Sequence, residues 1–108
     1  MTESDVLDRV YEVIRRRVLE RPAGSYVTKL LDGGPDAIAA KVREESEELL
    51  EAAASGRPEA IAHEAADLLF HVWVLLGACD VAPARVYETL QNRAGTSGLA
   101  EKASRGRP

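Results

Sequence analysis

The sequence predicts an all-α fold, a bundle of four to five helices, and three observations lead to this prediction. Three Tyr, one Phe and one Trp in 108 residues are few for a β-sandwich, whereas the Ala, Leu and Glu content favours helix. Apolar residues recur at helical spacing along several long segments. The connections between those segments are short, which favours antiparallel neighbours in a bundle.

The first helix is expected to begin at Ser4, a good N-cap, and to end at about residue 20. Pro22 and Gly24 then break the chain. Residues 26–31 are compatible with either a short helix or an ordered loop. The apolar face of the first helix consists of residues at helical spacing, namely Val6, Leu7, Val10, Val13, Ile14 and Val18.

The remaining helices are separated by segments rich in Gly and Pro. Pro35 is well placed to open a helix that extends to about residue 54. A break at residues 55–58 precedes a helix that extends to about residue 78, and Pro83 opens a last helix that ends near residue 93. Residues 1–94 are therefore expected to form one all-α domain. The tail from residue 95 to residue 108 is small, polar and basic, and we expect it to be flexible.

Composition limits the classes of function. With 45% apolar residues, 30% charged residues and a net charge of −4, the chain is typical of a globular domain and is not expected to bind nucleic acid. The apolar stretch at residues 68–79 is shorter than the roughly 20 residues of a membrane span, so no membrane partner is expected. Cys79 is a single cysteine, expected to be inert in the core, and residues 1–8 lack a signal-peptide pattern. These features predict a cytoplasmic protein.

The helix expected from residue 35 places a carboxylate on its apolar face. At about 100° per residue, Glu45 falls inside the apolar stripe, Glu48 lies on its edge and Glu44 lies just beyond that edge. An ionised carboxylate is costly to bury unless it is paired or coordinates a metal. Three other acids are expected to be merely solvated: Glu47, Glu51 and Glu59.

The following helix repeats this pattern with Glu64 and Asp67. Residues three apart share a helix face, so each helix presents one pair of acids. If the two helices pack antiparallel, four carboxylates converge, and four such charges require a cation. Oxygen ligands favour Mg²⁺ or Mn²⁺. Two alternatives remain open, a buried ion pair with Lys41 or Arg43 and a misassigned helix register.

The two acidic segments, residues 44–48 and 64–67, match the EExxE…ExxD signature of the all-α nucleotide pyrophosphohydrolases, the MazG-like superfamily. Within it, the chain resembles the phosphoribosyl-ATP pyrophosphatases of histidine biosynthesis. The resemblance covers nearly the whole chain and is carried by residues 22–26, 29–31, 41–42, 64–71 and 97–105.

The resemblance implies a MazG-like helical bundle that hydrolyses phosphoribosyl-ATP to phosphoribosyl-AMP and pyrophosphate with Mg²⁺. Water would attack the α–β phosphoanhydride. The residues that would carry the reaction are acids: Glu45, Glu48, Glu64 and Asp67 as metal ligands, and Glu44 as the general base or a ligand of a second metal.

Candidate substrate-binding residues accompany these acids. Lys41 either reaches a phosphate or pairs with a metal ligand, and Lys29 is a further cation. Ser25 and Tyr26 follow a Gly in a loop, where they either hold phosphate or ribose or take part in ordinary turn chemistry. His71, four residues after Asp67, either orients a ligand or is a core histidine with both ring nitrogens satisfied, and the second interpretation is favoured.

The helix expected up to residue 78 is apolar on all sides in its second half, which predicts a homodimer formed through apolar helices. Phe70 and Trp73 are expected in the core or in that interface. Three rival functions were considered: a house-cleaning (d)NTP pyrophosphohydrolase of the same superfamily, a di-iron carboxylate bundle and a helical interaction module without activity. The di-iron bundle requires Glu-x-x-His on two helices, and no Glu in the chain is followed by His three residues later.

Overall fold

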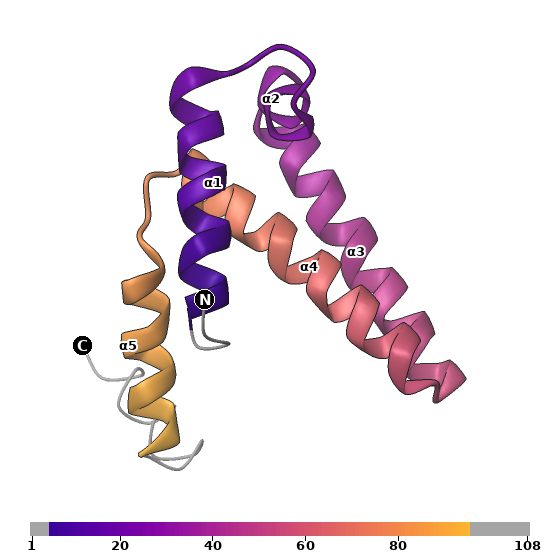
Figure 1. Ribbon diagram of the computed structural model, residues 1–108. Helices are drawn as coiled ribbons and strands as arrows, with labels where there is room; N and C mark the ends of the chain where they lie inside the picture. Colours follow the sequence, from indigo (N-terminus) through magenta and orange to yellow (C-terminus); the bar gives the residue numbers. More distant parts are fainter. Residues whose placement is uncertain (1–4, 96–108) are drawn as a thin grey trace, which may run out of the picture.

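The fold is given by a computed structural model, which describes residues 5–95 (Figure 1). Every regular element in this range is helical, which confirms the predicted all-α class. The elements are α1 (Val6–Glu20), α2 (Tyr26–Asp32), α3 (Pro35–Ser55), α4 (Pro58–Ala78) and α5 (Pro83–Ala94). The expected Ser4 cap and the expected flexible tail beyond residue 95 lie outside the described residues.

The expected helix boundaries agree with the structure to within two residues, and the ambiguous segment after Gly24 is the short helix α2. Pro35, Pro58 and Pro83 each occupy the first turn of a helix. A backbone N–H in this turn has no partner within the helix, so its absence in proline costs no hydrogen bond. Gly56, with φ +71°, ends α3 in the left-handed conformation that glycine adopts without strain. This turn reverses the chain, so α3 and α4 form an antiparallel hairpin.

The α3–α4 hairpin and the pair formed by α1 and α5 point away from each other (Figure 1). The short helix α2 connects α1 to α3 at the top of the view. The most extensive contact joins α3 to α4, followed by the contact of α1 with α4. The radius of gyration is 16.0 Å, larger than the roughly 13 Å of a compact domain of about 100 residues. The distal half of the hairpin therefore lies away from the other helices.

The core lies where α1, α2, α3 and α4 meet. Its buried apolar members are Ile14, Val27, Leu30, Ile38, Trp73 and Val74. Gly77 allows α1 and α4 to approach closely, because a Cβ at this position would lie 3.0 Å from Cγ2 of Ile14. Two hydrogen bonds to backbone carbonyls strengthen this contact. The Trp73 indole N–H donates to Leu7 O at 3.0 Å, and the Arg15 guanidinium donates to Gly77 O at 2.8 Å.

Two expectations about apolar residues were wrong. Cys79 is exposed rather than in the core, because it is the cap residue that follows the last turn of α4. Val6 and Val13 belong to the predicted apolar face of α1 but are more than two-fifths exposed. They lie toward the edge of a face whose centre, at Ile14, is the part that packs on α4.

By length and composition alone, α4 could cross a membrane, since its mean hydropathy reaches 1.3. Buried helices of globular cores pass the same test. Glu64 and Asp67 lie in the middle of α4, where a hydrocarbon environment would make their charges costly. The contacts of α4 with α3 and α1 cover only part of its apolar surface, and 22% of the apolar stretch is buried within one chain.

Replacing Ile14 by Ala should lower the free energy of unfolding by about 3 kcal/mol, because this truncation leaves a cavity in the core. Ile14 is 1% exposed, whereas Leu19 on the same helix is 70% exposed. Leu19→Ala is therefore the matched control and should cost less than about 0.5 kcal/mol. Urea unfolding of both variants measures the difference, and equal losses would contradict the packing of α1 on α4.

Candidate metal centre

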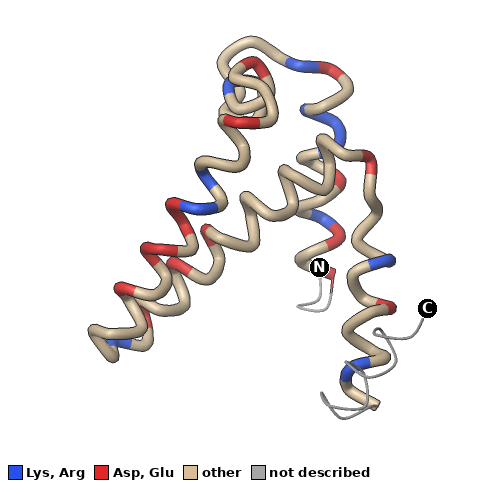
Figure 2. Tube along the Cα trace, turned by 180° about the vertical axis from the view of Figure 1, so that it is seen from behind, with Lys and Arg blue, Asp and Glu red and all other residues tan. Residues whose placement is uncertain are grey.

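Three carboxylates meet between α3 and α4. Glu45 and Glu48 lie almost one turn apart on α3, and Glu64 lies on α4. Acidic residues follow one another along both helices of the hairpin in Figure 2. One oxygen of each of the three carboxylates lies within 4.8 Å of the others. The i, i+3 spacing on α3 and the antiparallel packing of the hairpin produce this arrangement, as the sequence predicts. We call Glu45, Glu48 and Glu64 the acid cluster.

The acid cluster contains two carboxylate oxygens that are buried and unpaired. Oε2 of Glu45 and Oε2 of Glu64 have no hydrogen-bond partner among the described residues. The Glu45 side chain is 7% exposed. A buried carboxylate oxygen without a partner is costly, and a divalent cation is a partner that could serve both oxygens. The donor set, three carboxylates on two helices, fits Mg²⁺ or Mn²⁺.

Glu48 shows the mutual repulsion within the acid cluster. Interaction with the Glu45 carboxylate, followed by partial burial and the charge of Glu64, raises the pKa of Glu48 to about 7. Without a cation, the cluster therefore tends to retain a proton near neutral pH.

Lys41 is the cation nearest to this cluster on α3. Its Nζ lies 3.2 Å from Oε2 of Glu44 and 3.4 Å from Oε1 of Glu45. Burial lowers the pKa of Lys41, but the hydrogen bonds with Glu44 and Glu45 outweigh this effect and the pKa is raised. The buried ion pair, one of the two alternatives to a metal site, is thus present. It coexists with the acid cluster, because it uses only one of the two Glu45 oxygens.

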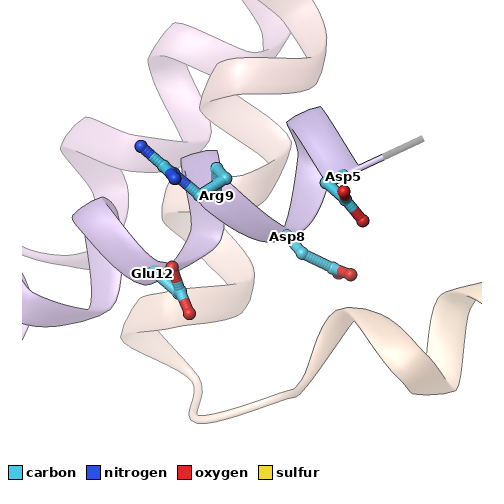
Figure 3. Close-up of a pocket in the computed structure, with 4 residues that line it drawn as sticks. All are labelled: Asp5, Asp8, Arg9 and Glu12. Carbon is cyan, nitrogen blue, oxygen red and sulfur yellow. The ribbon is translucent and has the colours of Figure 1, made fainter. Parts of the chain in front are cut away.

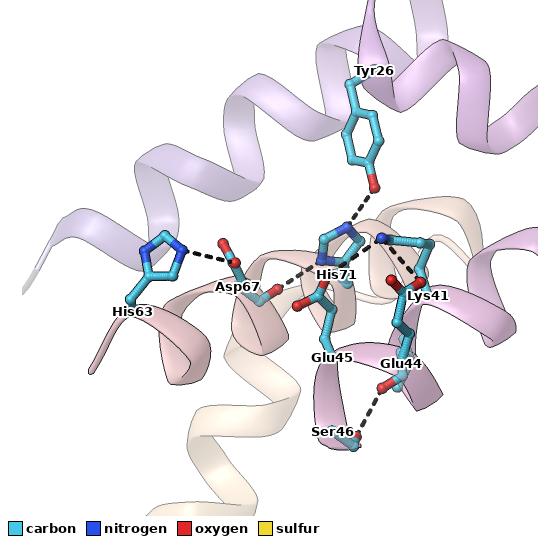
Figure 4. Close-up of polar contacts among 9 residues, drawn as sticks. Tyr26, Lys41, Glu44, Glu45, Ser46, His63, Asp67 and His71 are labelled. Carbon is cyan, nitrogen blue, oxygen red and sulfur yellow. Dashed lines mark hydrogen bonds and ion pairs between the residues drawn. The ribbon is translucent and has the colours of Figure 1, made fainter. Parts of the chain in front are cut away.

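Asp67 lies outside the acid cluster, so the expected convergence of four carboxylates at one point is reduced to three. Its Oδ2 lies 3.3 Å from Nε2 of His63, and these two residues form a second group of possible ligands with Glu64 (Figure 4). The reason is the helical rise. Glu64 faces α3, and Asp67 lies almost one turn further along α4. Glu64 is common to both groups, and ligation by Asp67 stays a prediction.

His63 is the functional candidate that the sequence interpretation missed. The sequence contains a signal for this role. His63 precedes Glu64 directly and lies four residues before Asp67, a spacing at which two side chains on a helix are neighbours. Its side chain is exposed, so its ring is accessible from solvent.

His71 is buried, and both of its ring nitrogens are satisfied, which confirms the favoured interpretation as a core histidine. Nδ1 lies 2.7 Å from the carbonyl oxygen of Asp67, and Nε2 lies 2.7 Å from the hydroxyl of Tyr26. The Tyr26 ring also packs against Phe70. Burial raises the pKa of Tyr26, and the charge of Glu45 adds to this effect while nearby Lys41 opposes it.

The residues predicted to bind substrate divide between two places. Ser25, Tyr26 and Lys29 line a hollow of about 550 Å³ around the start of α2, together with Ala23, Gly24, Thr28 and Asp32. Lys41 lies with the acids instead. The hydroxyl of Ser25 accepts a hydrogen bond from Thr28 N at 3.4 Å as the N-cap of α2, which supports the turn interpretation of this residue. We call this hollow the α2 pocket.

A second hollow, of about 260 Å³, lies at the start of α1 (Figure 3). Asp5, Asp8, Arg9 and Glu12 line it. All four come from a single helix start, and none belongs to the predicted site. This hollow therefore plays no part in the site described above.

Comparison with known proteins gives the family. A model of the family described as phosphoribosyl-ATP pyrophosphohydrolase matches residues 7–94, which include almost all of the five helices. The chain belongs to the phosphoribosyl-ATP pyrophosphohydrolase family. The resemblance inferred from the sequence is thereby confirmed.

Individual relatives resemble the chain over nearly its whole length. The phosphoribosyl-ATP pyrophosphatase of Geobacter sulfurreducens is 52% identical over 101 residues, which are 94% of each chain. That of Rhodopirellula baltica is 50% identical, over 92% of this chain and 85% of the relative. That of Novosphingobium aromaticivorans is 48% identical, over 97% and 98%. The chain thus spans most of the length of each of these three relatives.

In the absence of metal, the contribution of Glu48 should make the protein less stable as the pH rises from 4.5 to about 7. The pKa of Glu48 is higher in the folded chain, so the folded chain binds more protons than the unfolded chain across this interval, and stability falls with pH. Thermal unfolding in the presence of a chelator measures the effect. In Glu48→Gln this part of the pH dependence should disappear, and an unchanged pH dependence would contradict the coupling.

Proposed function

We propose that the chain hydrolyses phosphoribosyl-ATP to phosphoribosyl-AMP and pyrophosphate in histidine biosynthesis, with Mg²⁺ as its cofactor and Mn²⁺ as a possible substitute. The observation that carries the proposal is the acid cluster, with its two buried and unpaired oxygens, in a chain of the phosphoribosyl-ATP pyrophosphohydrolase family. The three members of the acid cluster offer oxygen donors, which hard divalent cations prefer.

Glu45, Glu48 and Glu64 would hold the metal, with Asp67 as the fourth ligand from the adjacent turn of α4. When bound, Mg²⁺ neutralises phosphate charge and lowers the pKa of a coordinated water. Lys41 orients Glu45 by binding Oε1, which leaves the buried Oε2 available for the metal. The protein thus fixes one ligand before substrate arrives.

Glu44 is the proposed general base. Its side chain is 55% exposed at the rim of the acid cluster, one turn from Glu48, and it accepts a hydrogen bond from Lys41. In this position it takes the proton of the water that attacks the α–β phosphoanhydride. The bond from the attacked phosphorus to its bridging oxygen breaks, and pyrophosphate leaves. A positioned base contributes about 10²–10⁴-fold to such a reaction.

The α2 pocket supplies the remaining substrate contacts in this proposal. Lys29 is exposed in the last turn of α2 and offers a cation to the polyphosphate. The exposed part of Tyr26 and the cap residue Ser25 border the same hollow. Lys41 lies between this pocket and the acid cluster, where it can exchange Glu44 for a phosphate oxygen.

We also propose that the enzyme is a cytoplasmic homodimer that binds neither nucleic acid nor membrane. Large apolar side chains of the hairpin are exposed, with Leu50 at 68% and Leu69 at 44%. A second copy would cover them. The net charge of −4 disfavours nucleic acid, and the free Cys79 suits a reducing compartment.

The decisive assay follows pyrophosphate release from phosphoribosyl-ATP with and without Mg²⁺. Glu45→Gln and Asp67→Asn should each reduce turnover by at least about 100-fold, because loss of even an outer partner of a metal ligand costs about 10–100-fold. Glu45→Gln should also abolish the increase in melting temperature that Mg²⁺ produces.

Glu47→Gln is the matched control for this assay. It removes an acid of the same helix that is exposed and points away from the cluster. It should retain wild-type turnover and metal response. Release of pyrophosphate from dNTPs with none from phosphoribosyl-ATP would overturn the choice of substrate, and full activity of Glu45→Gln would overturn the metal site.

The homodimer is tested by sedimentation equilibrium at micromolar concentration. The wild-type chain should give twice the 11.7 kDa of one copy. Leu69→Glu should shift the protein toward the monomer, because it places a charge on a half-exposed apolar position of α4. A monomeric wild-type protein would refute the proposal.

A further inference from the structure

The α2 pocket and the metal-binding helices belong to different parts of the chain, and one chain of hydrogen bonds joins them. The Tyr26 hydroxyl, in the first turn of α2, lies 2.7 Å from Nε2 of His71 on α4. Nδ1 of His71 lies 2.7 Å from the carbonyl oxygen of Asp67, one turn earlier on α4 (Figure 4). We call this chain the Tyr26–His71 strut.

The direction of the hydrogen bonds follows from their last acceptor. A carbonyl oxygen only accepts, so Nδ1 of His71 carries a hydrogen and donates it to Asp67 O. In the neutral imidazole Nε2 then has a free lone pair, and the Tyr26 hydroxyl donates to it. Both ring nitrogens are occupied, and the imidazole is held in one tautomer and one orientation.

The rings around the strut restrict its movement. Tyr26 and Phe70 are stacked with centroids 6.4 Å apart, and His71 meets both rings edge-on at 5.6 Å and 5.4 Å. His71 is only 6% exposed. The hydroxyl end of Tyr26 is therefore fixed, whereas the residue as a whole is 45% exposed and borders the α2 pocket.

This geometry changes the role that the sequence suggests for Tyr26. Its hydroxyl is already committed to His71 and is not a free donor for substrate. We infer that Tyr26 and His71 are positioning residues, and that the strut sets the distance between the α2 pocket, which takes the nucleotide, and the acids of α3 and α4. The inference rests on the proposed function and adds a role for two residues that do not touch the reacting atoms.

The strut acts on geometry and leaves metal affinity unchanged. His71 binds the backbone carbonyl of Asp67, not its carboxylate. The strut is linked to the acid cluster indirectly, through Lys41, which lies near the Tyr26 hydroxyl and pairs with Oε1 of Glu45. If the strut is broken and α2 shifts, the α2 pocket is misplaced relative to the acids. Turnover of bound substrate should then fall while Mg²⁺ binding persists.

Tyr26→Phe tests this inference, because it removes only the hydroxyl and keeps the ring packing. We expect kcat for phosphoribosyl-ATP to fall about tenfold, with the dissociation constant for Mg²⁺ alone within about twofold of wild type. Independently of activity, amide hydrogen exchange in residues 26–32 should accelerate, since α2 loses its anchor on α4.

Tyr87→Phe is the matched control. It removes another tyrosine hydroxyl, which donates to Oδ1 of Asp8 at 2.9 Å between α5 and α1, away from the site. Its kcat and the exchange of α2 should be those of the wild type. His71→Gln, which can still accept from Tyr26, should retain more turnover than His71→Leu, and Tyr26→Phe combined with His71→Leu should be no slower than His71→Leu alone.

Two results would overturn the inference: a kcat of Tyr26→Phe equal to that of Tyr87→Phe, or effects of the two strut substitutions that simply add. Both require an active wild-type protein. A wild-type protein without activity on phosphoribosyl-ATP would instead refute the proposed function, and the hydrogen-exchange result would still decide whether the strut anchors α2.

Discussion

A carboxylate buried on the inner face of α3 is the constraint on which the site depends. A charged carboxylate in an apolar setting needs partners, and the two oxygens of Glu45 differ in this respect. Oε1 pairs with Lys41, whereas Oε2 is buried with no hydrogen-bond partner among residues 5–95. The single positive charge of Lys41 therefore does not balance the negative charges of the acids between α3 and α4. The excess of negative charge explains both the raised pKa of Glu48 and the suitability of the position for a divalent cation.

Much of the fold was predictable because its signals are local. Pro35, Pro58 and Pro83 mark helix starts, and the angular position of Glu45 around its helix predicted its burial. An angle around one axis contains no information about the stagger between two helices, so the separation of Asp67 from the acid cluster was not predictable. The exposure of Cys79 likewise depends on how the helices pack around the end of α4, which is a property of the packed structure.

The contact between Tyr26 and His71 illustrates the same limit at the level of function. The two residues are 45 positions apart in the chain, and each had a plausible separate interpretation, as a substrate-binding hydroxyl and as a core histidine. Only the packing of α2 on α4 shows that each residue satisfies the other. The same packing explains why a tyrosine that borders a pocket has an exposed ring and an occupied hydroxyl.

The Gly56 turn has a consequence for how the site is assembled. All three members of the acid cluster lie on the α3–α4 hairpin, so their meeting requires only the closure of one short connection. Contacts of such low sequence separation form quickly, before elements distant in the chain are docked. During synthesis, the three acids can thus meet while α5 is still unmade. The geometry of the acid cluster is therefore a local property of one hairpin, whereas the contact of Tyr26 with His71 requires residues 45 positions apart to pack together.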